Sequence, residues 1–231
     1  MSMLEERIEI ANPTQPHCAV VLLLDTSGSM SGEKIVALNE GMRTLKDDIA
    51  KDELASKRVD LAVLTFGEGV KLIHDFSAVE DFDPPVLQTG GLTPMGEGIR
   101  RATDMVEERK QHYKVQGVDY FRPWIFLITD GEPTDMQPGD ASWNETTRRV
   151  HDGEANRKFM FFAVAVEPAN TELLTKIAPP NRPAVRLKGI EQFNKLFEWL
   201  SKSQAKVSAS KIGEHVALET PMAAGWGQIS A

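Results

Sequence analysis

The chain has 231 residues, of which 41% are hydrophobic and 26% are charged, and its formal net charge is −8. This composition is ordinary for a folded globular chain and excludes disorder as the overall state. One domain with short extensions accounts for the length most simply. Because the basic residues are scattered and outnumbered by acidic ones, we do not expect nucleic acid as a partner.

The expected compartment follows from the cysteine content and the chain start. The single cysteine, Cys18, cannot form an internal disulfide and lies beside an apolar run, where a buried small side chain is expected. The first residues, MSMLEERIEI, lack the pattern of a signal peptide, and no apolar run approaches membrane-spanning length. These features predict a cytoplasmic protein with no membrane partner.

Short apolar runs alternate with stretches of helical periodicity, which is typical of a largely parallel sheet covered on both faces. Because only Gly67, Glu68 and Gly69 separate the second and third runs, those two are predicted to form an antiparallel hairpin. The predicted fold class is α/β: a Rossmann-like, open, mostly parallel six-stranded sheet with one antiparallel edge strand and helices on both faces. The predicted strands are Ala19–Leu24, Val59–Phe66, Val70–Phe76, Trp124–Thr129, Phe159–Val166 and Ala184–Leu187.

Helices are predicted from apolar residues at three- and four-residue steps. The first spans about Glu33–Ala50, and a second follows Thr93. A third apolar stripe includes Ile190, Phe193, Leu196, Phe197 and Leu200.

The remaining segments are predicted to be irregular. Pro133, Pro138 and Gly139 indicate a loop over Glu132–Asn144, and the chain after about Val207 is rich in Ser, Ala and Gly. We therefore divide the chain into an N-terminal extension (1–16), a domain (17–206) and a C-terminal tail (207–231).

Oxygen-bearing side chains lie in three segments that can reach one edge of the predicted sheet. Asp25, Ser27 and Ser29 lie in the turn after the first strand, Thr93 precedes Pro94 at a predicted helix start, and Asp130 ends a buried strand. Open α/β sheets bind ligands at the carboxyl ends of their strands. Oxygen-only ligation selects a hard cation, and hydroxyls with a few waters beside carboxylates suit Mg²⁺ best, with Mn²⁺ and Ca²⁺ as alternatives.

These residues carry a family resemblance. Asp-Thr-Ser-Gly-Ser at 25–29, Thr93 and the Asp130-Gly131 pair resemble the three-part metal-ion-dependent adhesion site (MIDAS) of von Willebrand factor A (VWA) domains, over about Ala19–Lys202. The resemblance implies that Ser27, Ser29 and Thr93 ligate the ion directly or nearly so. It also implies that the two aspartates bind through water or directly.

A closer likeness comes from the segments LLLDTSGSMSGEKI, TFGEGV, FDPPVLQTGGLTPMGEGI and ITDGEPTD. They are similar to the stand-alone bacterial VWA proteins of the tellurite-resistance (TerY-like) group. This likeness implies a stress-response system in which protein kinase and phosphatase components are candidate partners. In VWA proteins a partner's Asp or Glu often completes the metal coordination, so an acidic protein partner is expected here.

Each candidate residue also has a purely structural interpretation. Ser27 and Ser29 could shape a turn, Thr93 could cap a helix, and the two aspartates could accept backbone hydrogen bonds. The placement of five suitable oxygens at three sheet-edge positions favours a joint site over five separate explanations. Asp135, further along the same loop, is interpreted as a solvated residue, with partner binding or extension of the site as the alternative.

The main functional alternative is a hydrolase or phosphotransferase that uses the ion as a Lewis acid. The segment GSMSG places Met30 where a serine-hydrolase elbow needs serine, and Gly32-Glu33-Lys34-Ile35 lacks the order of a P-loop. An aspartyl-phosphate mechanism at Asp25 lacks a second aspartate two positions later, where Ser27 stands. We therefore predict no catalytic residue and no enzyme activity.

Two further features bear on function. The histidines form no close metal-ligand pair and are interpreted as ordinary exposed or partly buried imidazoles: His17, His74, His112, His151 and His215.

A third class of function is a scaffold in which the ion only stabilises the loops. Neutral hydroxyl ligands argue against the scaffold, because they leave the ion's charge available to an incoming anionic oxygen.

Overall fold

The computed structural model describes residues 10–189, 191–218 and 228–230. Its central sheet has the strand order β3-β2-β1-β4-β5-β6. Only β3 runs antiparallel to its neighbour, and Gly67 pairs with Gly69 at the hairpin. The predicted fold class and hairpin are thus confirmed. The strands are β1 (Cys18–Asp25), β2 (Val59–Gly67), β3 (Gly69–Ala78), β4 (Trp124–Thr129), β5 (Met160–Val166) and β6 (Val185–Leu187).

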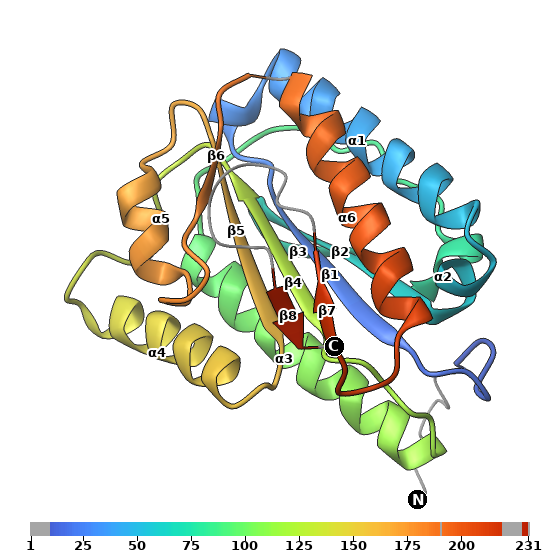
Figure 1. Ribbon diagram of the computed structural model, residues 1–231. Helices are drawn as coiled ribbons and strands as arrows, with labels where there is room; N and C mark the ends of the chain where they lie inside the picture. The colour runs from blue at the N-terminus through green and yellow to red at the C-terminus, as the bar shows by residue number, and fades with distance from the viewer. Residues whose placement is uncertain (1–9, 190, 219–227, 231) are drawn as a thin grey trace, which may run out of the picture.

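Helices cover both faces of this sheet (Figure 1). One face carries α1 (Glu33–Ala50), α2 (Glu53–Arg58) and α6 (Glu191–Ala209). The other face carries α3 (Met95–Gln116), α4 (Ala141–Ala155) and α5 (Thr171–Ile177). Short 3₁₀ turns lie at Gly28–Met30 and Val79–Asp81. Within the described ranges, no helix combines the length and the apolar character needed to cross a membrane.

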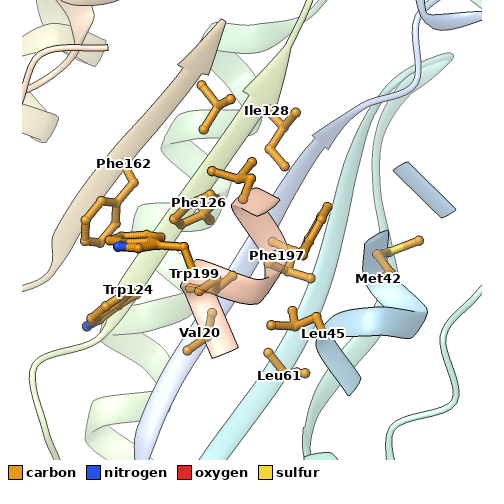
Figure 2. Packing of buried hydrophobic residues seen from close by; sticks show 14 of the residues in the cluster. Val20, Met42, Leu45, Leu61, Trp124, Phe126, Ile128, Phe162, Phe197 and Trp199 are labelled. Carbon is orange, nitrogen blue, oxygen red and sulfur yellow. The ribbon is translucent and has the colours of Figure 1, made fainter. Parts of the chain in front are cut away.

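Alternation along the central strand builds two cores. In β1, Val20 and Leu22 face the α1/α6 layer, whereas Val21 and Leu23 face the α3/α4 layer. Figure 2 shows the first core, in which Phe197 and Trp199 of α6 pack against the sheet. Both faces of β1, β2, β4 and β5 are buried, so these strands form a rigid base for the loops at their ends.

Two segments differ from the sequence-based prediction. Glu132–Asn144 is not irregular throughout, because α4 begins at Ala141, where the Asp140 side chain caps the helix by accepting the Trp143 N–H at 2.6 Å. In the C-terminal region, β7 (His215–Ala217) pairs with β8 (Gln228–Ser230), which the sequence pattern did not predict. Ile190 of the predicted third stripe, and residues 1–9 of the predicted extension, lie outside the described residues.

A buried ionic cluster lies at the amino end of β2. Asp60 accepts hydrogen bonds from His17 Nδ1 at 3.1 Å, Arg109 Nη2 at 2.7 Å and the Tyr113 hydroxyl at 2.5 Å. Burial would raise the pKa of Asp60, but the hydrogen bond from His17 and the nearby Arg109 charge outweigh it and hold the pKa below its ordinary value. His17 is fully buried, so its interpretation as an exposed or partly buried imidazole was wrong.

Candidate functional site

The parallel pairing of β1 with β4 brings the first pair of carboxylates to one edge of the sheet. Leu24 pairs with Ile128, so Asp25 at the end of β1 lies beside Thr129 at the end of β4. The Thr129 hydroxyl donates to Asp25 Oδ2 at 2.5 Å. Asp130 follows directly, and its side chain is fully buried. The two aspartates therefore meet where the β1 and β4 loops leave the sheet.

The turn after β1 connects two serine hydroxyls to Asp130. The Ser27 N–H donates to Asp25 Oδ1 at 2.8 Å and starts the 3₁₀ turn Gly28–Met30. Met30 is fully buried and anchors this turn in the core. Ser27 Oγ and Ser29 Oγ are hydrogen-bonded at 3.0 Å, and Ser29 Oγ donates to Asp130 Oδ1 at 2.6 Å. A chain of oxygens thus joins the β1 loop to the β4 loop.

The third segment is tied to the first by backbone hydrogen bonds. Gly90 N donates to the Thr26 carbonyl at 2.8 Å, and Gly28 N donates to the Gly91 carbonyl at 3.3 Å. Gly91 has a φ of 76°, and a Cβ there would lie 2.5 Å from the Gly67 carbonyl oxygen. Only glycine fits both the backbone angle and the close approach. The loop that carries Thr93 is therefore held against the ends of β1 and β2.

Thr93 is also fixed to the loop after β4. Its N–H donates to Thr134 Oγ1 at 3.1 Å, and its carbonyl accepts from the Thr134 N–H at 2.9 Å. A Cβ placed on Gly131 would lie 3.3 Å from Thr93 Oγ1 and 3.7 Å from Asp25 Oδ2. The Thr93 hydroxyl and the Asp25 carboxylate therefore approach one point next to Gly131.

All five sequence-predicted oxygens gather at this edge. Four of the five residues are at least nine-tenths buried, and the exposed Ser29 reaches them through its hydroxyl. Among the described residues, no three His, Cys, Asp or Glu side chains are grouped so that they could hold a metal ion. The cluster has two carboxylates, and the other three candidate metal ligands are hydroxyl oxygens. Oxygen ligands of this kind suit a hard cation.

The electrostatics of the cluster are unfavourable for two carboxylates alone. Burial raises the pKa of Asp25 above its ordinary value, and the negative charge of Asp130 adds to this effect. Hydrogen bonds from Ser27 and Thr129 lower this pKa but do not restore it. A positive charge beside Asp25 and Asp130 would offset both the burial and the mutual repulsion.

Sequence reasoning missed two residues of this cluster. Thr129 holds Asp25 Oδ2, and Lys34 extends from the first turn of α1 so that its ammonium contacts Asp130 Oδ2. The Lys34 ammonium also donates to the Ser29 carbonyl at 3.3 Å. A signal for Lys34 was present in the sequence: a lysine at a helix start, where the helix dipole disfavours a positive charge.

Asp135 has a structural role at the neighbouring helix. Its two carboxylate oxygens accept the N–H groups of Gly96 at 3.0 Å and Glu97 at 2.7 Å, at the start of α3. Its interpretation as a solvated loop residue was therefore wrong, because the carboxylate caps a helix. Cys18 is buried as predicted, and burial raises the pKa of its thiol far above the usual range.

The sheet order and the loop cluster at its carboxyl edge define an open α/β domain with a polar edge, where domains of this architecture commonly bind ligands. The chain belongs to the von Willebrand factor type A domain family, whose model matches residues 19–199. Domains of this family generally mediate protein–protein interactions, often in a metal-dependent manner.

Solved structures share the fold at low sequence identity. A von Willebrand factor type A protein from Catenulispora acidiphila has a TM-score of 0.62 at 16% identity, with 87% of this chain and 45% of that chain covered. The pilus adhesin SpaC from Lactobacillus rhamnosus GG has a TM-score of 0.62 at 13% identity, with 83% and 30% covered. The PilB minor pilin from Streptococcus sanguinis, as its D319A mutant, has a TM-score of 0.58 at 16% identity, with 84% and 63% covered.

The chain thus spans less than two thirds of the length of each of these proteins. At such low identity the likeness shows the fold alone. No curated protein matches the sequence significantly.

Proposed function

We propose that the protein is a metal-dependent protein-binding module whose ion is held by Asp25, Ser27, Ser29, Thr93 and Asp130. The observation that carries the proposal is the convergence of two buried carboxylates and three hydroxyls from three separate loops. The preferred ion is Mg²⁺, because hydroxyls and carboxylates with room for water match its oxygen coordination. When bound, the ion would supply a Lewis-acidic coordination position for a partner's oxygen.

The charge of the site favours an acidic partner. Because three of the five proposed ligands are neutral hydroxyls, the charge of the divalent ion is compensated less than it would be in a cage made only of carboxylates. An Asp or Glu of a partner protein would complete the coordination and give directional recognition.

The rim of the site offers apolar contacts for that partner. Leu92, next to Thr93, is 69% exposed, and Val86 is 68% exposed. Val86 lines a cavity of about 320 Å³, together with residues that include Thr26, Glu68 and Gly90. Exposed apolar side chains around a charged centre are suited to protein recognition, with the loops supplying specificity.

The cellular setting of the proposal comes from the sequence likeness to the tellurite-resistance group. We infer a cytoplasmic stress-response module, with protein kinase or phosphatase components as candidate partners. The motif segments around Asp25, Thr93 and Asp130 support this assignment, and the Mg²⁺-dependent capture described below would identify the partner directly.

Replacing Thr93 with valine is the sharpest test of the metal site. Within the described part of the chain, the Thr93 hydroxyl makes no hydrogen bond, so its removal leaves no protein group unpaired. We expect Thr93→Val to weaken Mg²⁺ binding roughly tenfold through the loss of one neutral ligand, with little change in unfolding free energy. Isothermal titration with MgCl₂ and urea unfolding would measure the two quantities.

Thr89→Val is a matched control, because the same hydroxyl-to-methyl change falls in the same loop. Its Mg²⁺ affinity should equal that of the wild type. Asp25 is a poorer probe, because its carboxylate also accepts from Ser27 N and Thr129 Oγ1, so its loss would mix folding and binding effects. Equal Mg²⁺ affinity in Thr93→Val and wild type would remove Thr93 from the site.

The same pair of variants tests partner binding. Affinity purification from the native cell should recover a partner in Mg²⁺ but not in excess EDTA, and Thr93→Val should recover less than Thr89→Val. A partner retained fully in EDTA would contradict a metal-mediated contact.

The purified protein is expected not to turn over phosphoesters, acyl esters or nucleoside triphosphates. Ser29 and Asp130 lie within hydrogen-bond distance of each other, but in this proposal both are ligands of the ion, which leaves neither free to act as nucleophile or general base. Activity screens in MgCl₂ and MnCl₂ measure this directly. Turnover that Ser29→Ala abolishes and Thr89→Val retains would instead establish the hydrolase or phosphotransferase alternative.

A further inference from the structure

The Lys34 side chain enters the proposed cation site from the protein itself. Its ammonium contacts Asp130 Oδ2 and donates to the Ser29 carbonyl at 3.3 Å. Asp130 Oδ1, on the same carboxylate, accepts the Ser29 hydroxyl at 2.6 Å. One positive charge of the chain is therefore held by the carboxylate that the divalent ion would use.

The position of Lys34 runs against the local preference of its helix. Gly32 is the N-cap of α1, so Lys34 lies in the first turn, where the partial positive charge of the helix end disfavours a cation. Its neighbour Glu33 has the charge sign that a helix start favours. The ion pair with Asp130 offsets the unfavourable interaction between Lys34 and the helix dipole. Residues that go against a local structural preference in this way are expected at functional sites.

The two members of the pair differ in their access to water. The Asp130 side chain is fully buried, whereas 24% of the Lys34 side chain is exposed. Lys34 can turn its ammonium into solvent on a flexible stem, whereas the Asp130 carboxylate is held in place by the hydrogen bond from Ser29. One cation can therefore replace another at Asp130 without refolding of the loop.

We propose that Lys34 is an internal competitor for the cation site, and that a divalent ion must displace its ammonium from Asp130 in order to bind. This inference rests on the proposed function, because it assigns a regulator of affinity to the same site. Like charges at one buried carboxylate repel, so Lys34 weakens metal binding and holds the loops together when no metal is bound.

Lys34→Met tests the competition directly, since it keeps the length of the side chain and removes the charge. We expect Mg²⁺ affinity, titrated calorimetrically with MgCl₂, to rise about three- to fivefold, near the upper end of the range for breaking a partly exposed ion pair. Lys34→Gln should behave in the same way and serves as a second variant if Lys34→Met folds poorly. Lys34→Arg keeps the charge and should not gain affinity.

Lys51→Met is the matched control for net charge. Lys51 follows the last residue of the same helix, about 25 Å along its axis, so screening should leave its effect on the site within twofold. An equal gain in Lys34→Met and Lys51→Met would overturn the competition, because it would reflect overall charge alone.

Thermal unfolding supplies a second measurement. In excess EDTA, Lys34→Met should unfold a few degrees below the wild type, because Asp130 has lost its counter-charge. In saturating MgCl₂ the difference should shrink or reverse, because tighter binding stabilises the folded state more. If the wild type binds Mg²⁺ and Lys34→Met binds no tighter, the inference fails while the proposed function stands. If neither protein binds Mg²⁺ or Mn²⁺, both fail.

Discussion

Replacing Asp60 with asparagine is expected to lower the free energy of unfolding by about 3–5 kcal/mol at pH 7, as for other broken buried ion pairs. Asp60 is 1% exposed and is the shared acceptor of three donors, including the buried Arg109 guanidinium. The asparagine would leave Arg109 without a counter-charge and would place an amide N–H₂ among donors. Urea unfolding of the two proteins measures the difference.

The loss of unfolding free energy in Asp60→Asn should depend on pH and should be smaller in acid. The pKa of Asp60 is lowered in the folded protein, so its carboxylate stabilises the fold above its unfolded pKa, and this stabilisation is lost as the pH falls through the folded pKa. The difference in unfolding free energy between wild type and Asp60→Asn should be largest at neutral pH and should decrease below about pH 4. If this difference in unfolding free energy stayed constant down to pH 3, the charge of Asp60 would not be its cause.

Asp104→Asn is the control for this change. Asp104 lies on the same helix as Arg109 and pairs with Arg149 at 2.8 Å, but its side chain is 53% exposed. Exposed ion pairs of this kind contribute at most about 1 kcal/mol. A similar loss of stability in both variants would mean that burial of the Asp60 cluster adds nothing.

The sheet and the general location of the site could be predicted from the sequence for one physical reason. Buried parallel strands are continuous apolar runs, and their carboxyl ends meet at one edge whatever the intervening loops do. Asp25 and Asp130 end two such runs, so their proximity follows from the pairing of β1 with β4. Thr93 required the family motif, because no strand ends at its position.

Other contacts depend on side-chain directions that spacing does not specify. The hydrogen bond from Ser29 to Asp130 joins loops 101 residues apart, and the one from His17 to Asp60 joins residues 43 apart. Lys34 has no pattern of its own beyond its unfavourable position at a helix start. Asp135 looked solvated because its partners, the N–H groups that begin α3, lie 38 and 39 residues away in the chain.

The start of α4 was missed for a different reason. Pro138 and Gly139 correctly indicate a turn, but the cap at Asp140 follows them immediately, and the predicted loop was extended past it to Asn144. The helix signal was local and could have been recognised, because an aspartate directly before a helical stretch is a common N-cap.

Replacing Asp130 with asparagine is expected to weaken Mg²⁺ binding about a hundredfold or more, since it removes a buried unit charge from the proposed coordination sphere. The asparagine carbonyl can still accept the Ser29 hydroxyl, and Lys34 can turn its ammonium to water, so the fold should be preserved. Isothermal titration with MgCl₂ and circular dichroism measure the two outcomes. The loss should exceed that of Thr93→Val, because Thr93 contributes a neutral oxygen.

Asp135→Asn, in the same loop, separates this effect from a general change of charge. Its carboxylate caps α3 rather than facing the proposed ion, so the variant should lose about 0.5–2 kcal/mol of stability and keep its Mg²⁺ affinity. The two substitutions should thus affect different measurements: Asp130→Asn lowers ion affinity, and Asp135→Asn lowers stability. Undiminished Mg²⁺ affinity in a folded Asp130→Asn protein would place the ion elsewhere and would leave the Ser29–Asp130–Lys34 contacts as a structural clasp between the β1 and β4 loops.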